Sequence, residues 1–394
     1  MLETLFLLLP VAAWYGWVMG RNSVRQAQRK QSSILAKHYY RGLNFLLSDE
    51  PDKAVDTLIK MIDLDSDTVE THIAMGKFFR HRGELDRAIR VHQNLVSKDE
   101  ISASLRETAL FELGRDYILA GFLERAENAF LQLMNSQKYF LKAQIQLFNI
   151  YQSTKDWLKA IELAEQMIGA GGDSDELCSR VAHFYCEQAD IEQNQSKLVL
   201  AQSNLQKAII ADDKAVRPWL MLGQMAMEQG KYNDAIDHLE QVPVRDVNWL
   251  SEAIPLISEC SDKLSDDSKL THILDKYWQL CATAYLAKVK QLAKSGENAK
   301  AAEVLLEQLK KHPTMKGFKT LMGLYISLQQ NDLQDQKQST NSLILLKELV
   351  EEQIKQRPKY RCHSCGFSGS KIHWLCPSCK KWGVVKPIKG LDGE

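Results

Sequence analysis

The chain has 394 residues, enough for two or three domains, and its 50 lysine and arginine residues are balanced by 50 aspartate and glutamate residues. This balance excludes a protein whose overall charge would attract nucleic acid. Besides two closely spaced cysteine pairs, four single cysteines lie in helical sequence: Cys178, Cys186, Cys260 and Cys281. This cysteine usage is typical of a reducing compartment rather than of a disulfide scaffold.

The stretch Thr4–Gly20 carries no charge and is rich in leucine, valine, alanine and aromatic residues. As a helix it would extend about 25 Å, slightly less than the hydrocarbon core of a bilayer, about 30 Å. Four cations follow within residues 21–30, whereas the only charge before the stretch is Glu3. This asymmetry predicts a single-pass transmembrane helix over residues 1–20 and a basic juxtamembrane segment over 21–32, with the bulk of the chain on the cytoplasmic side. A cleaved signal peptide, the alternative, needs its cations before the apolar stretch.

Residues 33–355 show a helical pattern that repeats about every 34 residues. A small residue recurs in a first helix and an alanine in a second. The clearest copy contains Trp219-x-x-Leu222-Gly223, followed by Ala235 and Leu239. The equivalent small or aromatic residue and alanine in other copies are Gly42 and Ala54, Gly76 and Ala88, Gly114 and Ala126, Phe148 and Ala160, and Ala182 and Ala201.

This pattern resembles the tetratricopeptide repeat, in which the small residue lets two helices approach closely. One helix pair cannot bury its apolar face, so stacked pairs form the core. The resemblance predicts an all-α fold, a tetratricopeptide-repeat superhelix (α-solenoid); an unrelated helical bundle is the alternative. Such repeats present a concave surface from their first helices, which gives six candidates for a partner groove: Lys77, Arg80, Phe111, Arg115, Asn149 and His183. The alternative is that these are ordinary solvated or packed positions.

Two Cys-x-x-Cys pairs, Cys362 with Cys365 and Cys376 with Cys379, are separated by ten residues. This spacing is typical of a metal site in which two tight turns close a tetrahedron of four thiolates. Gly366 follows the first pair, where such a turn often needs a positive φ. We therefore expect residues 356–394 to form a small zinc ribbon. Iron also suits four thiolates, and two disulfides are the alternative. Because protein fills all four coordination positions, the metal is expected to be structural.

The C-terminal segment is locally basic, with eight cations and two acids from Arg357 onward. A basic ribbon can bind RNA, DNA or anionic lipid, or can be simply a solvated face. The ribbon also has more large apolar side chains than so small a domain can bury: Phe367, Ile372, Trp374 and Trp382. We therefore expect it to dock against the last helices of the solenoid and cover their apolar end.

The sequence contains no Gly-x-x-x-x-Gly-Lys-Ser/Thr, His-Glu-x-x-His or Gly-x-Ser-x-Gly motif. No pattern places a nucleophile beside a base. We therefore predict that the protein is not an enzyme.

An N-terminal anchor, tetratricopeptide repeats and a C-terminal four-cysteine ribbon, in this order, resemble the lipopolysaccharide assembly protein B family of Gram-negative inner membranes. The resemblance covers essentially the full chain and implies a rubredoxin-like ribbon with Cys362, Cys365, Cys376 and Cys379 as metal ligands. It also implies a non-enzymatic adaptor that promotes degradation of the UDP-3-O-acyl-N-acetylglucosamine deacetylase by the membrane-bound ATP-dependent zinc protease. Such an adaptor coordinates lipopolysaccharide synthesis with assembly and export.

The implied partners are that protease, the deacetylase and other lipopolysaccharide assembly and transport proteins, with no nucleic acid; homo-oligomerisation is left open. Two alternatives remain. One is a nucleic-acid-binding regulator that uses the basic ribbon, and the other is a scaffold for envelope assembly unrelated to proteolysis.

Overall fold

The structure is a computed structural model that describes residues 14–17, 19–21, 69–99, 101–169, 171, 175–330 and 337–394. Within these ranges no helix is both long enough and apolar enough to cross a bilayer. Of the predicted anchor only residues 14–17 and 19–20 are described, and these are helical. The remainder of the anchor, most of the basic segment and the first predicted repeat lie outside the described residues.

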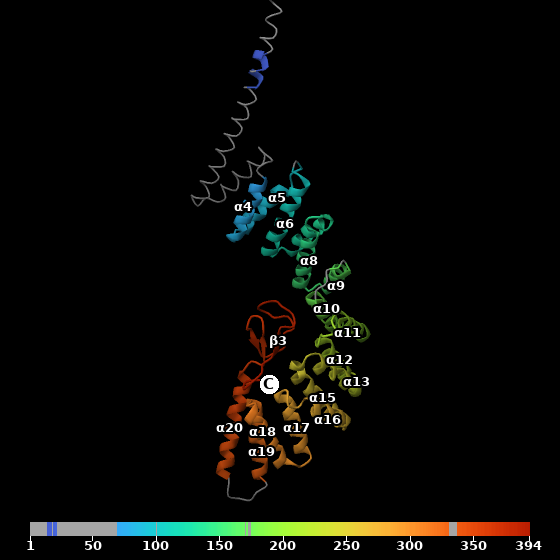
Figure 1. Ribbon diagram of the computed structural model, residues 1–394, viewed down its shortest axis with the longest axis vertical. Helices are drawn as coiled ribbons and strands as arrows, with labels where there is room; N and C mark the ends of the chain where they lie inside the picture. Colours follow the sequence, from blue (N-terminus) through green and yellow to red (C-terminus); the bar gives the residue numbers. More distant parts are fainter. Residues whose placement is uncertain are drawn as a thin grey trace, which may run out of the picture. The chain divides into compact units, whose positions relative to one another are not determined.

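The chain divides into two compact units, Met1–Asp156 and Trp157–Glu394. The described part of the first unit is a series of antiparallel helices joined by short turns (Figure 1). Its elements are α4 (Val69–His81), α5 (Leu85–Val96), α6 (Ala103–Leu119), α7 (Leu123–Gln132), the short 3-10 helix η2 (Leu133–Asn135) and α8 (Phe140–Thr154).

The second unit continues the helical series and ends in a small sheet (Figure 1). Its helices are α9 (Trp157–Gly169), α10 (Asp175–Asn194), α11 (Leu198–Ala211), α12 (Arg217–Glu228), α13 (Tyr232–Leu239), α14 (Gln241–Arg245), η3 (Val247–Trp249), α15 (Leu250–Leu264), α16 (Ser268–Tyr277), α17 (Ala282–Lys294), α18 (Asn298–Lys311), α19 (Met315–Gln330) and α20 (Lys337–Gln356). The predicted helical solenoid of tetratricopeptide type is confirmed.

The repeating glycine marks the point where the two helices of a pair approach most closely. A Cβ atom built on Gly76 would lie 2.3 Å from the ring of His92, and one on Gly114 would lie 2.6 Å from Phe130. The same contact recurs in the second unit, where a Cβ atom built on Gly223 would lie 2.6 Å from the side chain of Leu239. Such distances are far inside van der Waals contact, so any side chain here would push the helices apart. In these three pairs the glycine and its partner are 16 residues apart, which is the spacing between the two helices within one repeat.

Helix α20 ends at Gln356, two residues before Pro358, because the residue before a proline disfavours helical backbone. The chain then forms a three-stranded antiparallel sheet in the order β2-β1-β3. Its strands are β1 (Tyr360–Cys362), β2 (Ser368–Gly369) and β3 (Val385–Pro387). This sheet and its two turns form the ribbon.

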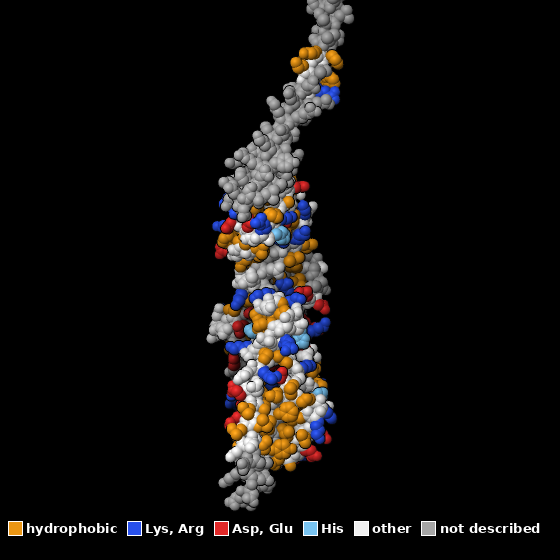
Figure 2. All heavy atoms as spheres, turned by 90° about the vertical axis from the view of Figure 1, so that its left-hand side faces the viewer, with side chains coloured by type: hydrophobic (Ala, Val, Ile, Leu, Met, Phe, Trp, Pro, Cys, Tyr) orange, Lys and Arg blue, Asp and Glu red, His pale blue; other side chains and the backbone are white. Residues whose placement is uncertain are grey.

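The end of the solenoid is not covered by the ribbon. On α20, Leu345, Leu346 and Leu349 are 62%, 47% and 66% exposed. Figure 2, whose view faces this helix, shows a broad apolar area over the last helices. The prediction that the ribbon covers this apolar end is therefore wrong.

Candidate metal centre and its docking face

The two Cys-x-x-Cys pairs form matching turns. Gly366 follows the first pair with φ +80°, the left-handed conformation expected from the sequence. Lys380 follows the second pair with φ +57°, so here a residue other than glycine adopts the left-handed conformation. In the first turn the Sγ atom of Cys362 accepts hydrogen bonds from the backbone N–H groups of Ser364 and Cys365, each at 3.4 Å. Such donors stabilise a thiolate.

The four sulfur atoms converge on one point. The Sγ atoms of Cys362 and Cys379 are 3.8 Å apart, those of Cys365 and Cys376 are 3.7 Å apart, and all four lie within 4.8 Å of one another. No pair is joined as a disulfide. A regular tetrahedron with metal–sulfur bonds of about 2.3 Å has edges of about 3.8 Å. The donor set therefore fits a tetrahedrally bound ion, and it does not choose between zinc and iron.

The surroundings of two of these cysteines shift their pKa values in opposite directions. The backbone N–H of Phe367 lowers the pKa of the exposed Cys365 to about 6, so this thiol is largely ionised at neutral pH. Cys362 and Cys376 are buried, with 2% and 0% exposure, and burial raises the pKa of Cys376 to about 11. An ion held between them would offset the cost of burying their negative charge.

Trp382 is one of two tryptophans that attach the ribbon to helices of the second unit. Its ring stacks on His183 of α10, with centroids 4.9 Å apart and planes 20° apart. It also forms T-shaped contacts with the rings of Trp157 and Phe184, whose centroids lie 6.1 and 5.7 Å from its own. Burial lowers the pKa of His183 to about 3, with Arg217 contributing further, so the stacked imidazole is neutral.

Trp374 makes the second aromatic contact. It stacks on Trp249 of η3, with centroids 4.6 Å apart and planes 21° apart. The guanidinium of Arg217 lies 5.5 Å from the centroid of the Trp374 ring, within the range of a cation–π interaction. Arg217 is itself buried and forms an ion pair with Glu187 at 2.8 Å.

Two polar contacts fix the register of the sheet on the solenoid. The hydroxyl of Tyr360 donates to Glu252 of α15 at 2.8 Å, and Lys386 pairs with Asp246 at 2.8 Å. Burial is the largest single effect on Asp246 and raises its pKa, but hydrogen bonds from Lys386 and Asn248, together with the charge of Lys386, lower it overall. The ribbon is therefore held on the solenoid by specific polar contacts as well as by the packing of its two tryptophans.

Residues 391–394 reach the later helices. Glu394 accepts hydrogen bonds from the backbone N–H and the hydroxyl of Thr283, each at 2.9 Å, and it pairs with Lys316. The carbonyl of Leu391 accepts from the N–H of Met315 at 2.9 Å. The predicted docking on the last helices is thus limited to this short segment, since the two tryptophans lie on α9, α10 and η3. Sequence reasoning missed Trp157, Arg217 and Trp249, because no motif or period in the sequence links them to the ribbon.

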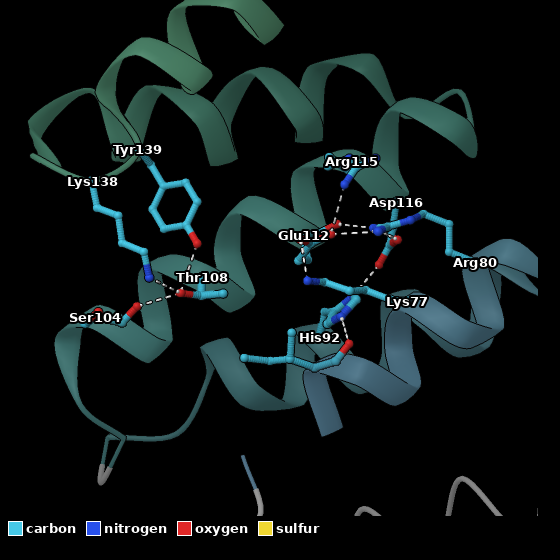
Figure 3. A network of polar contacts seen from close by, with 11 residues as sticks. Lys77, Arg80, His92, Ser104, Thr108, Glu112, Arg115, Asp116, Lys138 and Tyr139 are labelled. Carbon is cyan, nitrogen blue, oxygen red and sulfur yellow. Dashed lines mark hydrogen bonds and ion pairs between the residues drawn. The ribbon is translucent and has the colours of Figure 1, made fainter. Parts of the chain in front are cut away.

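Three of the groove candidates surround one carboxylate in the first unit (Figure 3). Glu112 pairs with Arg80 at 2.7 Å, with Lys77 at 3.1 Å and with Arg115 at 3.5 Å. Burial would raise the pKa of Glu112, but hydrogen bonds from Arg80 and Lys77 outweigh burial and lower it. Arg80 also pairs with Asp116 at 3.0 Å.

The expectation of an exposed surface is wrong for half of these six candidates. Arg80 is buried by its two carboxylates, and Phe111 stacks on Tyr139 with centroids 4.9 Å apart. His183 is buried by the ribbon of its own chain. Lys77 and Arg115 keep about two-fifths of their side chains exposed, and Asn149 is exposed on α8. Partner binding by these three stays a prediction.

Comparison with known proteins agrees with this architecture. Residues 360–387 match the family model of a rubredoxin metal binding domain, and residues 71–100 match that of a tetratricopeptide repeat. The protein named Lipopolysaccharide assembly protein B of Escherichia coli strain K12 is 38% identical, and the match covers 100% of both chains. The chain belongs to the lipopolysaccharide assembly protein B family. A second member, from Haemophilus influenzae, is 35% identical, again over 100% of both chains.

A tetratricopeptide repeat protein of Parabacteroides merdae is among the similar solved structures. It is 14% identical, with a TM-score of 0.32, over 72% of this chain and 99% of that chain. This likeness is too weak to bear on function. The family assignment depends on the full-length relatives, and the rubredoxin-like ribbon follows from its own match and from the four converging thiols.

Acid should weaken the docked ribbon through His183. Its pKa is about 3 in the folded chain and about 6.5 when unfolded, so only the unfolded chain takes up this proton below pH 6.5. The stabilisation is complete above about pH 6.5 and is lost as the pH falls towards 3, by about 1 kcal/mol at pH 5.5.

Urea unfolding at pH 7.5 and pH 5.5, with metal content measured at each pH, tests this prediction. The His183→Phe variant keeps a ring on Trp382 but has no proton to gain, so its loss of stability on acidification should be smaller by about 1 kcal/mol. Equal losses in the two proteins would show that this imidazole does not set the pH dependence.

Proposed function

We propose that this protein is a non-enzymatic adaptor that regulates lipopolysaccharide synthesis at the cytoplasmic face of the inner membrane. Its full-length relation to proteins named Lipopolysaccharide assembly protein B carries the proposal. The architecture supports it, because stacked tetratricopeptide repeats present extended surfaces suited to binding other proteins.

The adaptor brings the UDP-3-O-acyl-N-acetylglucosamine deacetylase to the membrane-bound ATP-dependent zinc protease. Holding two proteins on one scaffold raises their mutual effective concentration, to the order of mM for closely spaced sites. A single membrane span would further confine the search to the bilayer that holds the protease. Other proteins of lipopolysaccharide assembly and transport are further proposed partners, and through them synthesis is matched to export.

The ribbon's part in this function is structural. A bound ion would supply the folding free energy that a domain of this size lacks. The four thiols would hold the ion and so close the ribbon, and Trp374 and Trp382 fix the ribbon to the repeats. The adaptor surface therefore includes both the solenoid and the ribbon.

The half-life of the deacetylase in cells depleted of this protein tests the proposal. Depletion should lengthen the half-life several-fold, and re-expression of the full chain should restore it. A second, unrelated substrate of the same protease serves as the control and should decay at an unchanged rate. An unchanged deacetylase half-life would exclude this adaptor role and favour an envelope scaffold unrelated to proteolysis.

A nucleic-acid-binding regulator is the second candidate, and the charge of the ribbon favours it. Of the eight cations from Arg357 onward, only Arg357 and Lys386 form ion pairs with described residues. Binding of RNA or DNA by the full chain, weakening steeply as salt rises from 50 to 200 mM, would support this function. Absence of such binding at 50 mM salt would exclude it.

A further inference from the structure

An open cleft lies beside the docked ribbon, on the side formed by the first helices of the repeats. It has a volume of about 750 Å³, and helices α10, α12 and α15 form most of its wall. Trp374 of the ribbon and Tyr232 of α13 complete the lining. A volume of this size falls within the range of sites that bind a small ligand or a few residues of a peptide. Because Trp374 is part of the wall, the solenoid and the ribbon build the cleft together.

The rim of the cleft is acidic. Asp190, Glu228 and Glu259 come from three different helices and all are exposed. None of the three forms an ion pair with a described residue; Glu228 only accepts a hydrogen bond from Gln193, at 2.8 Å. Carboxylates elsewhere in the same unit do have cationic partners, as in Asp237 with Lys269 and Asp262 with Lys294. The rim of the cleft therefore carries negative charge that is not paired with a cation in the described part of the chain.

Apolar and adaptable side chains form part of the cleft wall, among polar ones. Met221, Met227, Leu256 and Trp374 line it. Methionine side chains are flexible and can repack around different apolar groups. Arg217 also lines the cleft; it is 94% buried, and its Nε–H has no acceptor.

We propose that this cleft binds a short cationic, amphipathic segment of a partner protein. Lysine or arginine side chains of the segment pair with the acidic rim, and a large apolar side chain enters between the methionines and Trp374. This inference deepens the proposed adaptor role, because it gives the chemistry by which one partner is recognised.

A fluorescent ten-residue peptide of alternating lysine and leucine is the probe, and fluorescence anisotropy with the full-length, metal-loaded chain is the measurement. The same peptide with glutamate in place of lysine is its control. The lysine peptide should bind, more weakly at 300 than at 50 mM salt, and the glutamate peptide should not. Absence of binding by the lysine peptide at 50 mM salt, or equal binding of both peptides, would overturn the proposal.

A charge-removing variant locates the binding. Glu228→Gln with Glu259→Gln keeps the shape of both side chains and should weaken binding about fivefold, as expected for two exposed ion pairs. The matched control is Glu303→Gln with Glu307→Gln on α18, which removes two exposed charges away from the cleft and should leave affinity unchanged. Equal weakening in both variants would overturn the assignment to this cleft. Deacetylase half-life is measured separately, so failure of the adaptor role is distinguishable from failure of the cleft.

Discussion

Replacing Cys362 and Cys365 by serine is expected to release the metal, unfold the ribbon and expose both of its docking tryptophans. Structural zinc contributes about 10–16 kcal/mol in zinc-finger peptides, which is as large as the whole stability of a typical domain. Residues 356–394 have only a small apolar cluster of their own around Tyr360 and Val385, so they cannot stay folded without it. Bound metal per chain should fall from one to zero, and residues 356–394 should become sensitive to protease.

The effect should extend into the solenoid. With the ribbon released, His183, Trp249 and Arg217 lose the rings that cover them, so amide hydrogen exchange should quicken in α10, α12 and α15. A matched control is Ser364→Ala with Ser370→Ala, which changes the same ribbon at exposed positions whose side chains are not predicted ligands. Unchanged exchange in those helices after metal loss would show that the ribbon does not stabilise the repeats.

Replacing Trp382 by alanine should separate docking from metal binding. The indole contacts Trp157, His183 and Phe184, and removing a packed tryptophan costs about 3–5 kcal/mol. The four cysteines are untouched, so the variant should still bind one metal ion per chain. Urea unfolding should show this loss of stability, and amides of α10 should exchange faster.

Leu349→Ala is the control for Trp382→Ala. It also removes a large apolar side chain from the same unit, but this leucine is 66% exposed, so the change in stability should stay below about 1 kcal/mol. A Trp382→Ala variant as stable as the native chain would mean that the ribbon is held mainly by its polar contacts. Loss of metal from that variant would mean that docking and metal binding cannot be separated.

The repeats were predictable because their defining contact is local. A glycine and its partner 16 residues later are in one helix pair, so the spacing is visible in the sequence without knowledge of the fold. The turns were less visible. Gly230 supplies the left-handed residue in one repeat, but Lys155 and Ser265 adopt the same conformation in others, with φ +60° and +54°. A search for turn glycines alone would overlook these repeats.

The four cysteines were predictable for the same reason, whereas the docking position was not. Tyr360 and Glu252 are 108 residues apart in the chain, and Lys386 and Asp246 are 140 apart. No sequence period links such pairs. Trp249 lies in η3, between helices where the repeat pattern fades, so nothing in its neighbourhood identified its partner.

The sequence does contain an indication that Arg80 is buried. Its two carboxylate partners, Glu112 and Asp116, lie 32 and 36 residues further on, which is one repeat later on a facing helix. An arginine with acids at this separation predicts an ion pair between neighbouring repeats rather than an exposed groove. The acids at these two positions therefore assign Arg80 to the interface between repeats and not to a partner groove.

Contact between the ribbon and helices α9 to α15 also sets an order of events on the ribosome. Trp157 leaves the exit tunnel 225 residues before Trp382, a delay of roughly 10–45 s at ordinary rates of bacterial translation. Throughout that interval Trp157 and its aromatic neighbours on the nascent helices stay exposed to solvent. They become buried only when residues 356–394 have emerged and the ribbon has folded around its ion. Cellular metal supply would therefore limit the yield of finished protein, with starved cells directing the half-covered chains to chaperones and degradation.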